Sequence, residues 1–419
     1  MTVIDQSRSK SGGGAEGTRL RRSLSLPLIT FYGLGTILGA GIYVLVGKVA
    51  TAAGMYAPIS FLLAAVTAGL SAFTYMELCS RFPLAGGAAV YTQQGFGLRW
   101  LSIVVGFLIV FSGLVSAATI TKGFVGYFQI FFDWPDVWII VVTVVTLAFL
   151  ASWGIAQSVT AAAVATVIEV GGLILIIAVA GPSFGALPER LPEFIPAFKA
   201  SSWEGIALGG FLAFYAFIGF EDMVNVAEEV KEPERNLPRA ILLAIGISIL
   251  LYLAVSLAAV LTLPLDELSE SGAPLALMFE KATGASPKIM ALIGLFAVIN
   301  GALIQIIMAA RMLYGMSREG WLPPGIGEIH AQTQTPILAT ALVSAAVLVL
   351  ALALPLVTLA KVTSFAILAV FALISLALIR MKRRGSPATG VYTVPHWVPY
   401  ASMITALSLL GFQTFSMLG

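Results

Sequence analysis

The sequence predicts an all-α polytopic membrane protein, and its composition, its sparse charge and its long apolar segments support this prediction. Of the 419 residues, 59% are hydrophobic and 11% are charged, whereas roughly a quarter of a soluble domain is charged. Apolar segments near the length of a helix that crosses the bilayer, about 20 residues, recur along the chain. The expected solvent of this chain is therefore lipid.

The rest of the composition argues against several other classes of protein. The net charge is only +2, and the basic residues lie in expected loops, so nucleic acid is not an expected partner. A single cysteine, Cys79, rules out an internal disulfide and a multi-cysteine metal site. The two histidines, His330 and His396, lie far apart in the sequence. We therefore expect no metal, no cofactor and no enzyme activity.

Eleven apolar segments are expected to cross the membrane as helices, after a disordered cytoplasmic tail at 1–26. The third and eighth exceed about 20 residues and are expected to tilt or to extend beyond the bilayer. The expected spans are 28–50, 57–79, 97–128, 136–153, 157–180, 205–227, 239–262, 286–316, 336–354, 358–380 and 399–418.

The distribution of basic residues predicts the orientation. With a cytoplasmic N-terminus, sixteen Lys and Arg residues fall in inner segments and seven in outer segments, as the positive-inside rule requires. We expect a multi-pass protein of the plasma (inner) membrane whose C-terminus lies outside. The connection at 181–204 carries four prolines and is expected to be a long outer loop.

Glycine interrupts the first span of each half of the chain. The sequence GTILGAGIY occupies 35–43, and the span at 205–227 contains Gly209, Gly210 and Gly219. Two glycine-interrupted spans at matching positions point to the substrate site of a carrier, and close helix packing is the alternative. Because each half has five spans, the halves form an expected inverted repeat. The predicted regions are repeats at 27–180 and 205–380, and an inner loop with an additional eleventh helix at 381–419.

A broken helix offers main-chain groups to a ligand. Unpaired N–H and C=O groups survive at membrane depth only where a cavity or a ligand satisfies them. The free N–H groups at a helix N-terminus can bind a carboxylate, and free carbonyls can bind an ammonium group. Segment 35–43 lacks Lys and Arg, so the main chain itself is expected to bind both ends of an α-amino acid.

Three motifs resemble those of the amino acid–polyamine–organocation family of permeases. They are GLGTILGAGIYVLVG in the first span, FYAFIGFEDMVNVAEEVKEPERNLPRAI in the sixth and RMLYGMSREGWLP in the eighth. The resemblance covers about 23 to 418. It implies a LeuT-type 5+5 inverted repeat with helices 1 and 6 broken, in a secondary active transporter that imports amino acids by alternating access. Many members have twelve spans, whereas eleven are expected here.

The resemblance also implies the substrate-binding residues. The first-span N–H groups would bind the carboxylate, carbonyls of both broken spans would bind the ammonium group, and Phe217 and Phe220 would flank the site as a gate or as core residues. The implied residues are Thr36, Ile37, Gly39, Ala40, Gly41, Ile42, Tyr215, Ala216, Phe217 and Ile218.

Glu169 is the one ionisable residue of the fifth span. A charge at the middle of a span costs about 2.5–3.5 kcal/mol on insertion scales, and such residues are functional by default. Many sodium-independent relatives of the resembled family have a lysine at this place. We expect Glu169 to carry the coupling proton; a structural, protonated glutamate and a sodium ligand assisted by Thr36 are the alternatives.

Other polar residues at membrane depth are interpreted less specifically. Glu221 and Asp222 are expected to stabilise the second half of the broken sixth helix or to line the path. For Asn300, Gln305, Ser112 and Ser116, hydrogen bonds between helices are favoured over substrate contact. The alternative functions are a polyamine or organic-cation carrier or exchanger and a sensor that binds amino acids without transport.

Overall fold

The computed structural model describes residues 22–84, 86–153, 159–385 and 390–418. Within these ranges the chain forms helices and loops, with a single isolated β-bridge. The first expected span is two helices separated by Gly39, α1 (Leu26–Leu38) and α2 (Ala40–Ala53). The sixth consists of α10 (Ala200–Phe214) and two 3-10 helices, η4 (Tyr215–Phe217) and η5 (Phe220–Glu229).

The other nine expected spans are single helices within a few residues of their predicted bounds. They are α3 (Ala57–Arg81), α5 (Arg99–Phe128), α6 (Asp136–Trp153), α7 (Val159–Val179), α11 (Pro233–Thr262), α14 (Lys288–Arg318), α15 (Ile337–Ala353), α16 (Leu356–Arg384) and α17 (Trp397–Leu418).

Length and apolar composition support the membrane assignment. Seven helical stretches of the described chain are long and apolar enough to cross a membrane, and the first of them, 26–81, includes α1, α2 and α3. Two shorter apolar helices lie at Ala163–Val179 and Ile337–Ala353. The protein is an all-α polytopic membrane protein.

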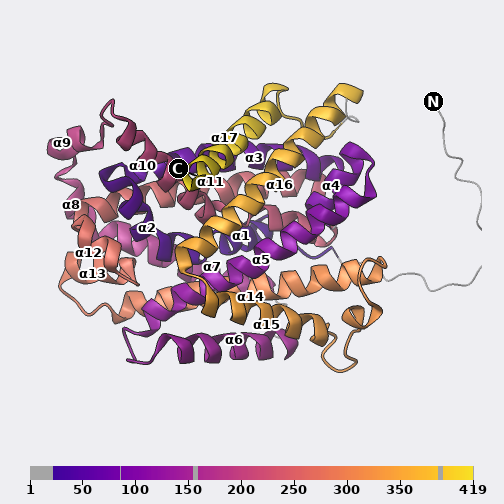
Figure 1. Cartoon of the computed structure of the whole chain (residues 1–419), viewed down its shortest axis with the longest axis horizontal. Coiled ribbons are helices and arrows are strands. Elements are labelled where there is room, and N and C mark those ends of the chain that lie inside the picture. The colour runs from indigo at the N-terminus through magenta and orange to yellow at the C-terminus, as the bar shows by residue number, and fades with distance from the viewer. Residues whose placement is uncertain (1–21, 85, 154–158, 386–389, 419) are drawn as a thin grey trace, which may run out of the picture.

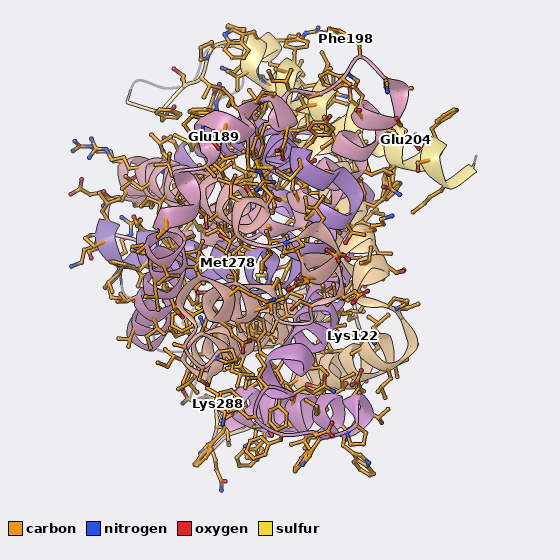
Figure 2. The ribbon with its side chains drawn as sticks, turned by 90° about the vertical axis from the view of Figure 1, so that its left-hand side faces the viewer. Lys122, Glu189, Phe198, Glu204, Met278 and Lys288 are labelled. Atoms are coloured by element: carbon orange, nitrogen blue, oxygen red, sulfur yellow. The ribbon has the colours of Figure 1, made fainter. Side chains whose placement is uncertain are left out.

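Short helices that the sequence did not predict lie in the connections. They are η1 (Gly54–Tyr56), α4 (Gly87–Phe96), α8 (Gly181–Phe184), α9 (Leu187–Arg190), η3 (Leu191–Phe194), α12 (Leu265–Glu270), α13 (Pro274–Thr283) and η6 (Pro324–Gly327). Figure 1 shows α8, α9, α12 and α13 gathered at one end of the molecule and α4 near the other. Viewed from the first end, Glu189, Phe198 and Glu204 lie over the same upper part of the molecule (Figure 2). The connection at 181–204 therefore carries short helices rather than being a simple loop.

Close helix packing surrounds the two broken spans. Helix α14 packs along α5, α11 along α3, and α10 against both α2 and α3. A Cβ on Gly126 of α5 would lie 2.2 Å from the carbonyl oxygen of Gly272, so only glycine permits this approach. At the periphery, Trp138, Phe149 and Trp153 of α6 are about 60% exposed, and Figure 1 places α6 along one edge. These side chains face the lipid.

The chain is fixed just before α1. The Leu24 N–H donates to the Glu229 carbonyl at 3.0 Å, and the Lys231 N–H donates to the Leu24 carbonyl at 2.9 Å. This bridge joins the start of the first span to the end of the sixth. Residues 1–21 lie outside the described structure, so the predicted disordered tail is described only in its last residues, where the main chain is paired.

A buried ion network lies where α3, α16 and the segment before α17 meet. The carboxylate of Glu77 is fully buried and pairs with Arg81 one turn later and with the Nζ of Lys382 at 2.7 Å. The N–H of Val394 donates to the same carboxylate at 2.8 Å. Glu77 therefore ties α16 and the start of the last helix to α3.

We expect Glu77→Ala to destabilise the protein strongly. Removing one partner of a buried ion pair leaves uncompensated charges on Arg81 and Lys382, which typically costs about 3–5 kcal/mol. The melting temperature of the purified protein in detergent should fall by several degrees. Glu280→Ala, at an exposed position of α13, is the matched control and should leave it unchanged. Equal melting temperatures for both variants would contradict the structural role of Glu77.

Candidate functional site

The first break is a single non-helical residue between two helices. Gly39 has φ −43° and ψ −139°, so α1 stops at Leu38 and α2 begins anew at Ala40. A new helix N-terminus leaves its first N–H groups without intrahelical partners. The main chain of Gly39 lies against Gly301 of α14, whose Cα is 3.6 Å from the position of an added Cβ. A second glycine, Gly301, therefore packs against the break.

The second break spans more residues than the first. Helix η4 ends at Phe217, Ile218 is extended, and Gly219 has φ +127°, a conformation that residues with a side chain rarely adopt. A Cβ on Gly219 would lie 2.4 Å from the carbonyl oxygen of Thr36. Glycine is therefore required here both for the turn and for contact with the first break.

The two breaks touch each other through the main chain. An added Cβ on Gly41 would lie 2.4 Å from the Cα of Ala216. The hydroxyl of Thr36 lies within hydrogen-bond distance of two carbonyl oxygens, that of Gly33 at 2.9 Å and that of Gly219 at 3.0 Å. The two interrupted spans are therefore in direct contact through their main chains.

Side chains satisfy part of the main chain that the breaks expose. The carboxylate of Glu221 accepts a hydrogen bond from the Gly219 N–H at 2.9 Å. The hydroxyl of Tyr252 donates to the carbonyl of Ile37 at 2.8 Å. The Ile37 carbonyl, which the resemblance assigned to an ammonium group, already has one partner in this structure and retains one lone pair.

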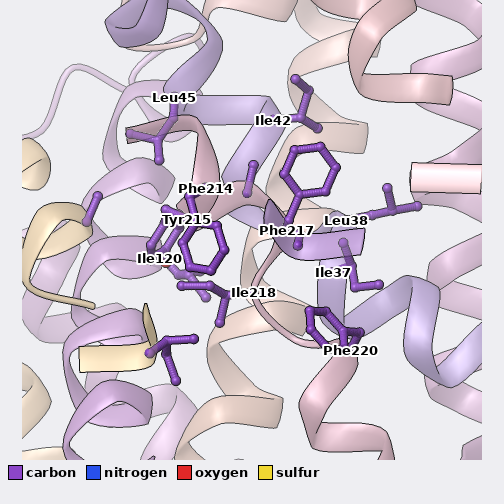
Figure 3. Packing of buried hydrophobic residues seen from close by; sticks show 14 of the residues in the cluster. Ile37, Leu38, Ile42, Leu45, Ile120, Phe214, Tyr215, Phe217, Ile218 and Phe220 are labelled. Carbon is purple, nitrogen blue, oxygen red and sulfur yellow. The ribbon is translucent and has the colours of Figure 1, made fainter. Parts of the chain in front are cut away.

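A small cavity lies between the two breaks and helices α5 and α14. Figure 3 shows this region, where Ile120 of α5 lies beside Tyr215 and Ile218 of the sixth span, and Ile37 of α1 lies near Leu38 and Phe217. The broken spans and the two continuous helices each contribute to the wall. The lining residues are Thr36, Ile37, Gly39, Gly41, Ser116, Ile120, Tyr215, Ile218, Gly301, Ile304 and Gln305.

Six of the ten residues implied by the resemblance line this cavity: Thr36, Ile37, Gly39, Gly41, Tyr215 and Ile218. Ile42, Ala216 and Phe217 are buried but are not part of the lining. The ring of Phe217 packs on Tyr252 with centroids 5.0 Å apart, and Phe220 packs on Phe371 at 5.2 Å. Both rings are core residues in this conformation. The side chain of Ala40 lies outside the described structure.

Sequence reasoning did not assign the α5 and α14 part of the wall to a ligand. From the sequence, Ser116 and Gln305 are expected to be polar groups at membrane depth that link helices. Both interpretations describe real contacts, because the hydroxyls of Ser116 and Tyr215 are 2.9 Å apart and the Gln305 amide donates to Asp222 at 3.2 Å. Their polarity within apolar spans was the available signal.

Glu169 lies close to both the first break and α14. Its carboxyl group is fully buried, and the amide of Asn300 donates to Oε1 at 2.9 Å. Its other oxygen, Oε2, has no hydrogen-bond partner among the described residues. Asn300 adjoins Gly301, which lines the cavity. A buried carboxyl group whose second oxygen lacks a partner is costly to hold in its charged form.

The described residues contain no group of three or more His, Cys, Asp or Glu side chains arranged to hold a metal ion. The oxygens that the cavity offers to a ligand are main-chain carbonyl, hydroxyl and amide oxygens. The two breaks supply such oxygens together with N–H donors.

Known proteins resemble this chain over nearly its whole length. A family described as "Amino acid permease" matches residues 24–418. The chain is 26% identical to the branched-chain amino acid permease BcaP of Bacillus subtilis, over 87% of this chain and 82% of that protein. It is 28% identical to the methylthioribose transporter of the same organism, over 98% and 90%. It is 29% identical to the vacuolar cationic amino acid transporter 2 of Arabidopsis thaliana, over 89% of this chain and 61% of that longer protein.

We expect Gly41→Val to abolish ligand binding at the cavity. The added side chain cannot avoid the Ala216 main chain, 2.4 Å from its Cβ position, and it would displace one break from the other. Ligand-induced thermal shifts of the purified protein measure binding directly. Gly69→Val is the matched control, because no atom lies within 4 Å of a Cβ at that helical position. Undiminished thermal shifts in Gly41→Val would place the binding site elsewhere.

Proposed function

Because the chain belongs to the amino acid permease family, we propose that it is a secondary active transporter that imports amino acids by alternating access. The observation that best supports this function is the contact between two interrupted spans beside a buried cavity. This arrangement concentrates main-chain donors and acceptors at membrane depth, where they are otherwise too costly to leave unpaired. An amino acid presents a carboxylate and an ammonium group that match them.

The cavity lies between helices that can move as separate groups. One wall is the pair of broken spans, which pack on α3 and α11, and the other is α5 with α14. Rocking of one group against the other around a fixed site is the usual form of alternating access. We place the protein in the plasma (inner) membrane with a cytoplasmic N-terminus, in accord with the excess of basic residues in the segments assigned to that side.

We further propose that protons drive the cycle and that Glu169 carries them. Its Oε1 is bound to Asn300 on α14, whereas Thr166, one turn earlier on α7, lies against Gly35 of α1. Rocking of α1 relative to α14 thus changes the surroundings of the carboxyl group. A change in surroundings is what alternately favours its charged and its neutral form.

Uptake into proteoliposomes tests the transport proposal. We expect radiolabelled amino acids to accumulate when the lumen is more alkaline than the outside, and putrescine not to accumulate. Accumulation of putrescine alone would assign the protein to amine transport. Binding of amino acids without uptake or counterflow would instead identify a sensor, and either result would overturn the proposal.

We expect Glu169→Gln to abolish accumulation driven by a pH gradient while leaving amino acid exchange measurable. Glutamine retains the shape and the contact with Asn300 but cannot release a proton. Glu280→Gln, at an exposed position of α13, is the control and should accumulate substrate as the unaltered protein does.

A pH-driven accumulation that survives in Glu169→Gln would show that Glu169 is structural. Accumulation that follows a sodium gradient, and not a pH gradient, would contradict proton coupling while leaving the transport proposal intact.

A further inference from the structure

The cavity has two chemically different ends. One end is formed by the breaks themselves, at Thr36, Gly39, Gly41 and Ile218. The other is formed by side chains of α5, η4 and α14, at Ser116, Ile120, Tyr215, Ile304 and Gln305. If the breaks bind the carboxylate and the ammonium group that all amino acids share, the second end of the cavity faces the amino acid side chain. The side chains there determine which amino acid is accepted.

Gln305 presents an oriented amide to this second end. Its Nε2 donates to Oδ2 of Asp222 at 3.2 Å. The amide oxygen therefore points the other way, toward α5, where a Cβ on Gly113 would lie 3.3 Å from it. Within the described residues this oxygen makes no hydrogen bond. The amide oxygen of Gln305 is therefore a hydrogen-bond acceptor without a donor.

The neighbouring hydroxyls do not supply that donor. Those of Ser116 and Tyr215 are 2.9 Å apart and bond to each other, and the Tyr215 hydroxyl also lies 3.3 Å from the Ser116 carbonyl oxygen. The remaining wall at this end is the apolar pair Ile120 and Ile304. A matching ligand thus has a small apolar surface and one hydrogen-bond donor.

The lining argues against a cationic side chain. None of the lining residues is charged. Asp222, behind Gln305, is 2% exposed and already bonded to the amide. A lysine or arginine substrate would have to displace Gln305 to reach it, and an unpaired buried charge is far more costly than an unpaired hydroxyl.

We propose that Gln305 is a specificity-determining residue and that the transporter selects small uncharged amino acids with a side-chain hydroxyl, threonine and serine, over apolar amino acids of the same size. The proposal rests on the proposed function. Threonine and valine have nearly the same shape, so the acceptor on Gln305 is what distinguishes them. Asp222 acts as a positioning residue, because it fixes which end of the amide faces the cavity.

Competition with radiolabelled alanine uptake in proteoliposomes tests this selection. We expect threonine to inhibit at a concentration about fivefold lower than valine, as the loss of one hydrogen bond implies, and lysine and arginine to inhibit weakly. In Gln305→Leu the ratio between threonine and valine should fall to one or invert. Gln413→Leu, at a buried position of α17 outside the cavity, is the matched control and should keep the original ratio.

A second variant separates orientation from folding. In Asp222→Leu the acceptor that holds the Gln305 NH₂ is gone, so the amide no longer presents its oxygen to the cavity in one fixed orientation. The threonine preference should then fall as it does in Gln305→Leu. Because the ratio is measured within each variant, a lower amount of active protein does not affect it.

Three results would overturn the selection: valine inhibiting as well as threonine in the unaltered protein, lysine or arginine inhibiting best, or an unchanged ratio in Gln305→Leu. Each is compatible with uptake of alanine, which would leave the proposed function standing. If no amino acid is taken up at all, the proposed function fails and this proposal fails with it.

Discussion

The fold depends on the requirement that every main-chain polar group at membrane depth has a partner. An unpaired N–H or C=O group in hydrocarbon costs several kcal/mol, yet this chain interrupts two spans at Gly39 and at Ile218–Gly219. The interruptions are tolerated because each lies against the other. Thr36 bonds to the Gly219 carbonyl, and Glu221 takes up the Gly219 N–H. The groups left over face a cavity instead of lipid.

The packing of the surrounding helices supports the contact between the two breaks. Glycine occupies the positions where main chains approach most closely, as at Gly41 against Ala216 and at Gly126 against Gly272. Tyrosine hydroxyls connect the breaks to their neighbours, as Tyr252 does to Ile37. Peripheral helices such as α6 place large apolar side chains toward the lipid and close the shell around the core. Contacts with several elements therefore stabilise the two broken helices.

Much of the fold could be predicted from the sequence because the lipid environment imposes a simple pattern. Spans of about 20 apolar residues are recognised by length alone, and all eleven expected segments are helical here. Both breaks lie in the spans where the sequence predicts them, although glycine also permits close packing there, as at Gly209 and Gly210 within α10. The division into inverted repeats, the orientation and the roles of individual site residues stay predictions.

The cavity wall was harder to predict, because it depends on the rotation of α5 and α14 about their axes. Helix α5 is largely apolar, so its sequence does not indicate that Ile120 faces the site and does not decide whether Ser116 contacts a ligand or another helix. Phe217 lies within a motif segment but points to Tyr252, since η4 is wound as a 3-10 helix and directs successive side chains to different sides. The short helices α12 and α13 lack the length that makes a span recognisable.

A structure determined by electron cryomicroscopy with a bound amino acid would show directly whether the two breaks bind the ligand. We predict the ligand carboxylate within hydrogen-bond distance of the N–H groups at Gly39–Gly41, and its ammonium group against carbonyls of Thr36 and the 215–218 segment. A ligand bound by charged side chains away from both breaks, or a continuous helix through residues 35–43, would contradict it.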